Sequence, residues 1–231
     1  MFGLFFKKIN LVFTDGSLLK KIGFVLVALA LFRVLAAIPI PGVDTLRLEQ
    51  FLSGNQLFGF LNIFSGGGLS GLSIVMLGVA PYITASIIMQ LLTFVFPSLK
   101  AMNQEEGEIG RKKFAQYGRL LSVPLAFVQG FSFLFLLENQ GVVTSLSAFD
   151  FGVNLLIIVA GSMLLMWIGE LVTEFGVGNG ISIIIFAGIL AGLPQIVSQL
   201  SFAFDPSQIP LFVLLGILSL LVTYGIVLVT E

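Results

Sequence analysis

The sequence contains neither cysteine nor histidine. The absence of cysteine excludes disulfide bonds and thiolate chemistry, and the absence of both residue types excludes the usual zinc sites. Without histidine, the chain can form neither a Ser-His-Asp triad nor a histidine proton relay. The sequence also lacks a glycine-rich phosphate-binding loop. We therefore expect a protein that is not an enzyme and that carries no metal ion and no cofactor.

Charged residues are also scarce. They occupy 10% of the 231 positions, whereas hydrophobic residues make up 57% and the mean hydropathy is +1.09. An ordinary soluble domain has about 25% charged residues, and a membrane-spanning helix needs about 20 mostly apolar residues. The composition therefore predicts an all-α membrane protein, a polytopic helix bundle. The predicted spans are Ile22–Ile38, Ser73–Val95, Leu120–Leu137, Val153–Val172, Ile181–Ile196 and Ile209–Thr230.

The few basic residues are distributed unevenly between the predicted loops. Four lysines precede the first span and five basic residues lie between the second and third, whereas the outer loops contain only Arg47. Because cytoplasmic loops carry the excess of lysine and arginine, we expect the N-terminus and, after six spans, Glu231 to lie in the cytoplasm. The segment Pro97–Arg119 then becomes the longest inner loop. It is either a solvated loop or a docking surface for a cytosolic partner.

The run from Phe60 to Leu92 joins a glycine-rich half to a long apolar half. Its glycines, Gly66–Gly68 and Gly71, weaken helices. At membrane depth, irregular backbone is tolerated only where protein buries it or where it lines a water-filled cavity. The run therefore indicates a pore or cavity.

Two predicted helices carry pairs of β-branched residues one turn apart. Val79 and Ile83 flank Pro81, which we expect to bend the helix locally. Ile181 and Ile185 follow a five-residue loop that contains three glycines. Two such helices can line an apolar constriction that gates by dewetting. Pairs of this kind more often face lipid or pack between helices, so the spacing alone leaves both interpretations open.

Several long motifs resemble the SecY family, the channel subunits of the bacterial Sec protein translocase. They are Phe32–Val43 (FRVLAAIPIPGV), Phe64–Ile88, Met166–Glu170 (MWIGE) and Gly178–Gly188 (GNGISIIIFAG). The resemblance runs from about Lys20 to Glu231, with the motifs in the order of the family. It implies an inverted-repeat channel of ten helices that passes unfolded secretory polypeptides across the membrane and membrane segments sideways into it.

By this resemblance, the chain corresponds to spans one to six of the ten. Residues 1–21 would form a cytoplasmic N-terminal segment, and residues 22–196 the first five-helix half, with a plug at about residues 60–72. Residues 197–231 would form an outer loop and the sixth span, which begins the second half. Spans seven to ten would then come from outside this sequence.

The resemblance also implies roles for individual residues. A pore ring would take Val79, Ile83, Ile181 and Ile185, and would be completed by residues of spans seven and ten. A lateral gate would include Thr84, Ile87, Ile88 and Gln129, with Thr84 and Gln129 in a polar cluster that holds it shut. Without the resemblance, Gln129 is an ordinary interhelical hydrogen-bonding residue. The plug would include Phe60, Ile63, Phe64, Ser65, Gly66, Gly67, Gly68, Leu69 and Ser70.

The resemblance further implies partners and a location. SecE and SecG would be membrane partners, SecA or the ribosome would dock on the cytoplasmic face, and secretory and membrane-protein precursors would be the substrates. The protein would lie in the lipid bilayer of the bacterial cell membrane.

Two other classes of protein remain open. One is a small-substrate secondary transporter, because those folds also contain broken helices. Its coupling ions usually need polar sites at the midplane, and only Arg33 lies well inside a predicted span, near the middle of the first. An unpaired charge there costs about 2.5–3.5 kcal/mol, so Arg33 should face protein or water. The other is a structural membrane scaffold, which would not need the glycine-rich segment.

The charge asymmetry predicts which side of the membrane each loop occupies. Because the chain has no cysteine, single introduced cysteines report topology without background labelling. A chain with Arg47→Cys should react with an impermeant thiol reagent added outside the cell, and a chain with Lys112→Cys only when the reagent reaches the cytoplasmic side. The reverse labelling pattern would contradict the six-span arrangement.

Overall fold

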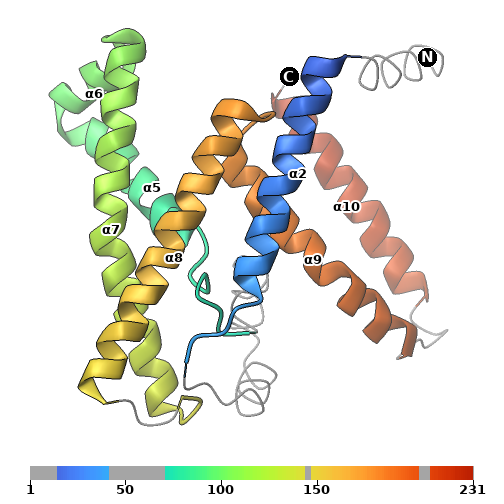
Figure 1. Cartoon of the computed structure of the whole chain (residues 1–231). Helices are drawn as coiled ribbons and strands as arrows, with labels where there is room; N and C mark the ends of the chain where they lie inside the picture. Colours follow the sequence, from blue (N-terminus) through green and yellow to red (C-terminus); the bar gives the residue numbers. More distant parts are fainter. Residues whose placement is uncertain (1–14, 42–70, 144–146, 203–208, 231) are drawn as a thin grey trace. The chain divides into compact units, whose positions relative to one another are not determined.

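A computed structural model of the chain describes residues 15–41, 71–143, 147–202 and 209–230, which are mainly helical (Figure 1). The chain forms two compact units, Met1–Gly192 and Leu193–Glu231. The helices are α2 (Gly16–Ala36), α5 (Ala80–Val95), α6 (Pro97–Gln104), α7 (Gly107–Asn139), α8 (Ala148–Phe175), α9 (Gly180–Phe202) and α10 (Ile209–Thr230).

Each predicted span overlaps a helix, but fewer helices are both long and apolar enough to be a clear span. Among the described residues, three helices are long and apolar enough to cross a membrane: α7, α8 and the Pro210–Val229 part of α10. The number rises to four if the bent pair α5 and α6 is one span. Helix α5 has only 16 residues, and the apolar part of α9 is Gly180–Pro194. The chain is therefore a multi-pass membrane protein, in which α5 is shorter than its predicted span.

Helix α2 begins with a side-chain cap and ends before two prolines. Asp15 accepts a hydrogen bond from the Ser17 amide at 2.9 Å, and this bond holds the pKa of the Asp15 carboxyl below its ordinary value. Arg33, which was predicted near the middle of the first span, lies in the last turn of α2. A positive charge there is favourable, because the carbonyl end of a helix carries partial negative charge.

The second predicted span is wrong over its first seven residues. Residues 71–79 form turns, and α5 begins only at Ala80. The Ile74 amide donates to the Ile38 carbonyl at 2.9 Å, and the Ile40 amide donates to the Leu72 carbonyl at 2.8 Å. These bonds to the chain after α2 replace helical ones. Leu72, Val75 and Met76 are almost completely buried, so the protein covers this irregular backbone.

The predicted bend at Pro81 is also wrong. Pro81 lies in the first turn of α5, where proline disturbs no helical hydrogen bond because the first amides have no partner within the helix. The bend lies instead at Phe96, between α5 and α6, whose axes differ in direction by 114°. Pro97 is the first residue of α6.

The predicted inner loop Pro97–Arg119 is helical over most of its length. Helix α6 and the first turns of α7 occupy it. Arg111, Lys112 and Lys113 are exposed on α7. An exposed helix face therefore gives these charges the same access to solvent that a loop would give. Gly110 is buried against α6, where an added Cβ would overlap the Met102 carbonyl oxygen.

Helix α8 joins two apolar clusters of the first unit. It contacts α7 and α2 and runs between them (Figure 1). Its Leu165, Ile168 and Val172 belong to a cluster with α2, residues 71–79 and α9. Its Ile158 belongs to a second cluster with the same irregular segment and with the C-terminal end of α7. In the second unit, the apolar window of α10 has no buried residue.

The close packing of α8 on residues 71–79 depends on a glycine. A Cβ added at Gly161 would overlap the Ile74 carbonyl oxygen, whereas one added at Gly152 of the same helix would meet nothing within 4 Å. Gly161→Ala should therefore destabilise the protein by about 1–3 kcal/mol. Gly152→Ala should leave stability unchanged or raise it by up to about 1 kcal/mol. Thermal unfolding in detergent measures both, and equal effects would contradict this packing.

Candidate functional site

The four residues predicted for a pore ring lie in one apolar cluster. Val79 is 3% exposed and immediately precedes α5. Ile83 on α5 and Ile181 and Ile185 on α9 are partly buried against the same cluster. Residues about 100 positions apart are therefore brought together, and their role as a ring remains a prediction.

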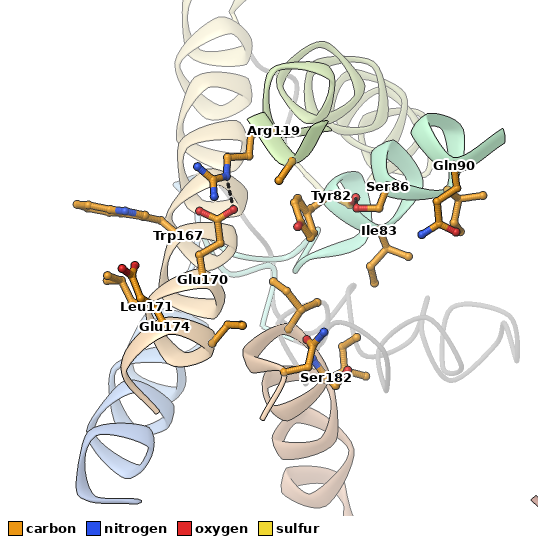
Figure 2. Close-up of a pocket in the computed structure, with 16 residues that line it drawn as sticks. Tyr82, Ile83, Ser86, Gln90, Arg119, Trp167, Glu170, Leu171, Glu174 and Ser182 are labelled. Atoms are coloured by element: carbon orange, nitrogen blue, oxygen red, sulfur yellow. Dashed lines mark hydrogen bonds and ion pairs between the residues drawn. The ribbon is translucent and has the colours of Figure 1, made fainter. Parts of the chain in front are cut away.

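A pocket of about 790 Å³ opens beside this cluster (Figure 2). Its walls come from α5, α7, α8 and the start of α9. Ile83, Ile181 and Ile185 supply apolar lining together with Ile87, Trp167 and Leu171, and the remaining wall is mostly polar. The polar lining residues are Ser86, Gln90, Arg119, Glu170, Thr173, Glu174, Asn179 and Ser182.

An ion pair between α7 and α8 crosses the polar part of the pocket. The Arg119 guanidinium donates to the Glu170 carboxylate (Figure 2). The two side chains are 43% and 21% exposed, so solvent screens the pair and its contribution to stability is modest. The sequence analysis missed this pair, because it placed Arg119 in a loop and Glu170 only in a family motif. Their opposite charges near the same predicted membrane surface were the available signal.

The predicted lateral-gate residues are partly brought together. The Gln129 side-chain amide on α7 donates to the Thr84 hydroxyl on α5 at 3.5 Å, and this hydroxyl donates to the Ala80 carbonyl at 3.0 Å. The first distance is at the long limit for a hydrogen bond. Ile87 is 52% exposed and lines the pocket, whereas Ile88 is half-buried. The predicted plug residues from Phe60 to Ser70 lie outside the described residues.

The start of α9 is hydrogen-bonded to α8. The Gly180 amide donates to the Thr173 hydroxyl at 2.9 Å, and the hydroxyl donates to the Gly169 carbonyl at 2.8 Å. The predicted turn between the helices is present, with Gly178 at φ +73°. Asn179 caps α9, since its side chain accepts from the Ser182 amide at 3.1 Å. The glycine spacing predicted the turn, but nothing in the sequence singled out Thr173.

Related sequences cover most of this chain. The SecY family profile matches residues 73–231. The protein translocase subunit SecY of Buchnera aphidicola subsp. Acyrthosiphon pisum is 42% identical over a 204-residue alignment that covers 84% of this chain and 46% of that protein. The same subunit of Escherichia coli K12 is 45% identical over a 190-residue alignment that covers 80% of this chain and 43% of that protein. The chain thus spans about half the length of the curated relatives it matches.

Two solved structures share the fold. They are described as a protein conducting channel and as Sec61 in the canine ribosome-channel complex from the endoplasmic reticulum. Each has a TM-score of 0.52 and 24% identity, and each alignment covers 72% of this chain and 35% of the other. The predicted fold class, an all-α polytopic bundle, is confirmed. The profile match and the identities above 40% show that the chain belongs to the SecY family.

Proposed function

We propose that this chain forms part of a protein-conducting channel that passes unfolded secretory polypeptides across the membrane and membrane segments sideways into it. The observation that carries the proposal is the convergence of Val79, Ile83, Ile181 and Ile185 on one apolar cluster beside the pocket. A narrow apolar constriction closes to ions by dewetting. It also offers a passing chain no strong hydrogen bonds, so the polypeptide can leave as readily as it enters.

The rest of the channel comes from outside this sequence in our proposal. Because the chain spans about half the length of its relatives, spans seven to ten would complete the ring and face the lateral gate. SecE and SecG would support the channel in the membrane, and SecA or the ribosome would deliver precursors. Conduction itself is passive, so these cytosolic partners supply the driving energy.

The charge pattern supports an orientation with the N-terminus and Glu231 in the cytoplasm of a bacterial cell. Lys20 and Lys21 lie near the start of α2, and Arg111, Lys112 and Lys113 near the start of α7. Cytoplasmic segments carry this excess of basic residues. Arg119 and Glu170 would then place the polar part of the pocket towards the cytoplasm, where the unfolded chain enters.

The hydrogen bond between Gln129 and Thr84 links α5 and α7 beside the proposed gate. Interhelical hydrogen bonds in membrane proteins contribute about 0.6 kcal/mol on average, and this one is long at 3.5 Å. It therefore adds little to the packing of α5 on α7, and in our proposal the gate opens between these helices and spans seven to ten. A small-substrate secondary transporter is not favoured, since the named relatives are protein translocase subunits.

Site-specific photocrosslinking tests the proposed path of the polypeptide. The chain is assembled with the remaining spans of a SecY relative, and a photoreactive residue replaces either Ile83 or Phe135. Ile83 lines the pocket, whereas Phe135 is 54% exposed on α7 away from it. A radiolabelled precursor halted during transport should crosslink at position 83 and not at position 135. Equal crosslinking at both positions, or none at 83, would contradict the proposed path.

A further inference from the structure

Thr173 joins two backbone groups that belong to different helices. Its hydroxyl donates to the Gly169 carbonyl within α8 at 2.8 Å and accepts from the Gly180 amide, the first of α9, at 2.9 Å. The first amides of a helix have no acceptor within the helix. A residue before the helix usually caps them, but here a side chain of the preceding helix supplies one acceptor. The bond therefore ties the start of α9 to α8.

Two glycines bring the same helices into close contact. A Cβ added at Gly180 would overlap the Gly169 carbonyl oxygen, and one added at Gly169 would overlap the Ile181 side-chain tip. The tip of Ile181 thus fills the space that a side chain at position 169 would take. Gly180 is buried, so its amide has little access to water if the Thr173 hydroxyl is removed.

The position of both pore isoleucines follows from these contacts. Ile181 is the second residue of α9. It directly follows Gly180, whose amide donates to the Thr173 hydroxyl. Ile185 lies one turn later on the same face. A movement of the first turn of α9 away from α8 would therefore move both isoleucines, which line the pocket.

We propose that Gly169 and Thr173 form a seat for the first turn of α9 and that Thr173 is a positioning residue for Ile181 and Ile185. The importance of the two isoleucines rests on the proposed function. The seat itself rests on the hydrogen bonds and close contacts of α8 and α9. Thr173 also lines the pocket, but in this proposal it acts through the backbone of Gly180.

A spin label on α9 measures the seat independently of transport. The full chain in membrane vesicles carries Ser182→Cys as the labelling site, because Ser182 is exposed and lines the pocket. Gln90→Cys, on α5 in the same pocket and also exposed, is the matched control. Each is combined with Thr173→Val, which removes the hydroxyl and keeps the shape, or with Thr173→Ser, which keeps the hydroxyl.

Thr173→Val should raise the mobile fraction of the label at position 182 by about fivefold or more, the order expected when a buried donor loses its acceptor. The label at position 90 should not change, and Thr173→Ser should restore the wild-type spectrum at 182. An unchanged label at 182 in Thr173→Val, an equal change at 90, or no rescue by serine would each overturn the seat. If Thr173→Val does not accumulate, Gly169→Ala tests the other half of the seat, because it must displace Ile181.

Measuring the ion leak of the assembled resting channel tests the proposed function separately from the seat. If the label at 182 becomes mobile and the leak rises in Thr173→Val, the seat positions residues that seal the pore. If the label becomes mobile and the leak stays at the wild-type level, the seat stands and the sealing role of Ile181 and Ile185 fails.

Discussion

The contact between α8 and the irregular segment 71–79 is the constraint on which the rest of the first unit depends. Backbone without helical hydrogen bonds is costly in a membrane unless protein covers it. Gly161 lets α8 approach the Ile74 carbonyl closely, and Val75 and Met76 fill the apolar clusters on either side. The segment can therefore leave the helical state and still be buried.

The geometry of the pocket depends on α8, because both the segment before α5 and the start of α9 pack on this helix. Val79 ends the irregular segment that packs at Gly161, and Ile181 packs on Gly169. These two contact points on α8 are eight residues apart, about 12 Å along the helix. The predicted pore residues are thus placed by close contacts to one helix, and their side chains pack in the apolar cluster to which α8 contributes.

Hydropathy predicted where the helices lie but not all of their limits. The span Ile209–Thr230 matches α10, because a long apolar run has no competing structure in a membrane. The helix prediction for residues 73–79 failed because an apolar run does not distinguish a helix from a turn that the protein buries. The bend at Pro81 was predicted because the helix was expected to begin at Ser73. Hydropathy did not locate the actual start at Ala80, which puts Pro81 in the first turn. The charges of Pro97–Arg119 indicated solvent contact, which an exposed helix face satisfies as well as a loop does.

The site was only partly predictable. The resemblance supplied Val79, Ile83, Ile181 and Ile185, and the structure brings them together. The pairing of Arg119 with Glu170 joins residues 51 positions apart, and such tertiary contacts leave no local pattern in a single sequence. Thr173 looks like an ordinary helical threonine until the position of Gly180 is known.

Precursor transport into liposomes tests most directly the central claim, that this chain lines part of a channel whose remaining wall comes from elsewhere. The chain is reconstituted alone or together with SecE and a fragment that supplies spans seven to ten, and SecA with ATP drives transport in both cases. We expect transport only with the added spans, because four ring residues from this chain leave the constriction open on one side. Robust transport by the chain alone would contradict the claim.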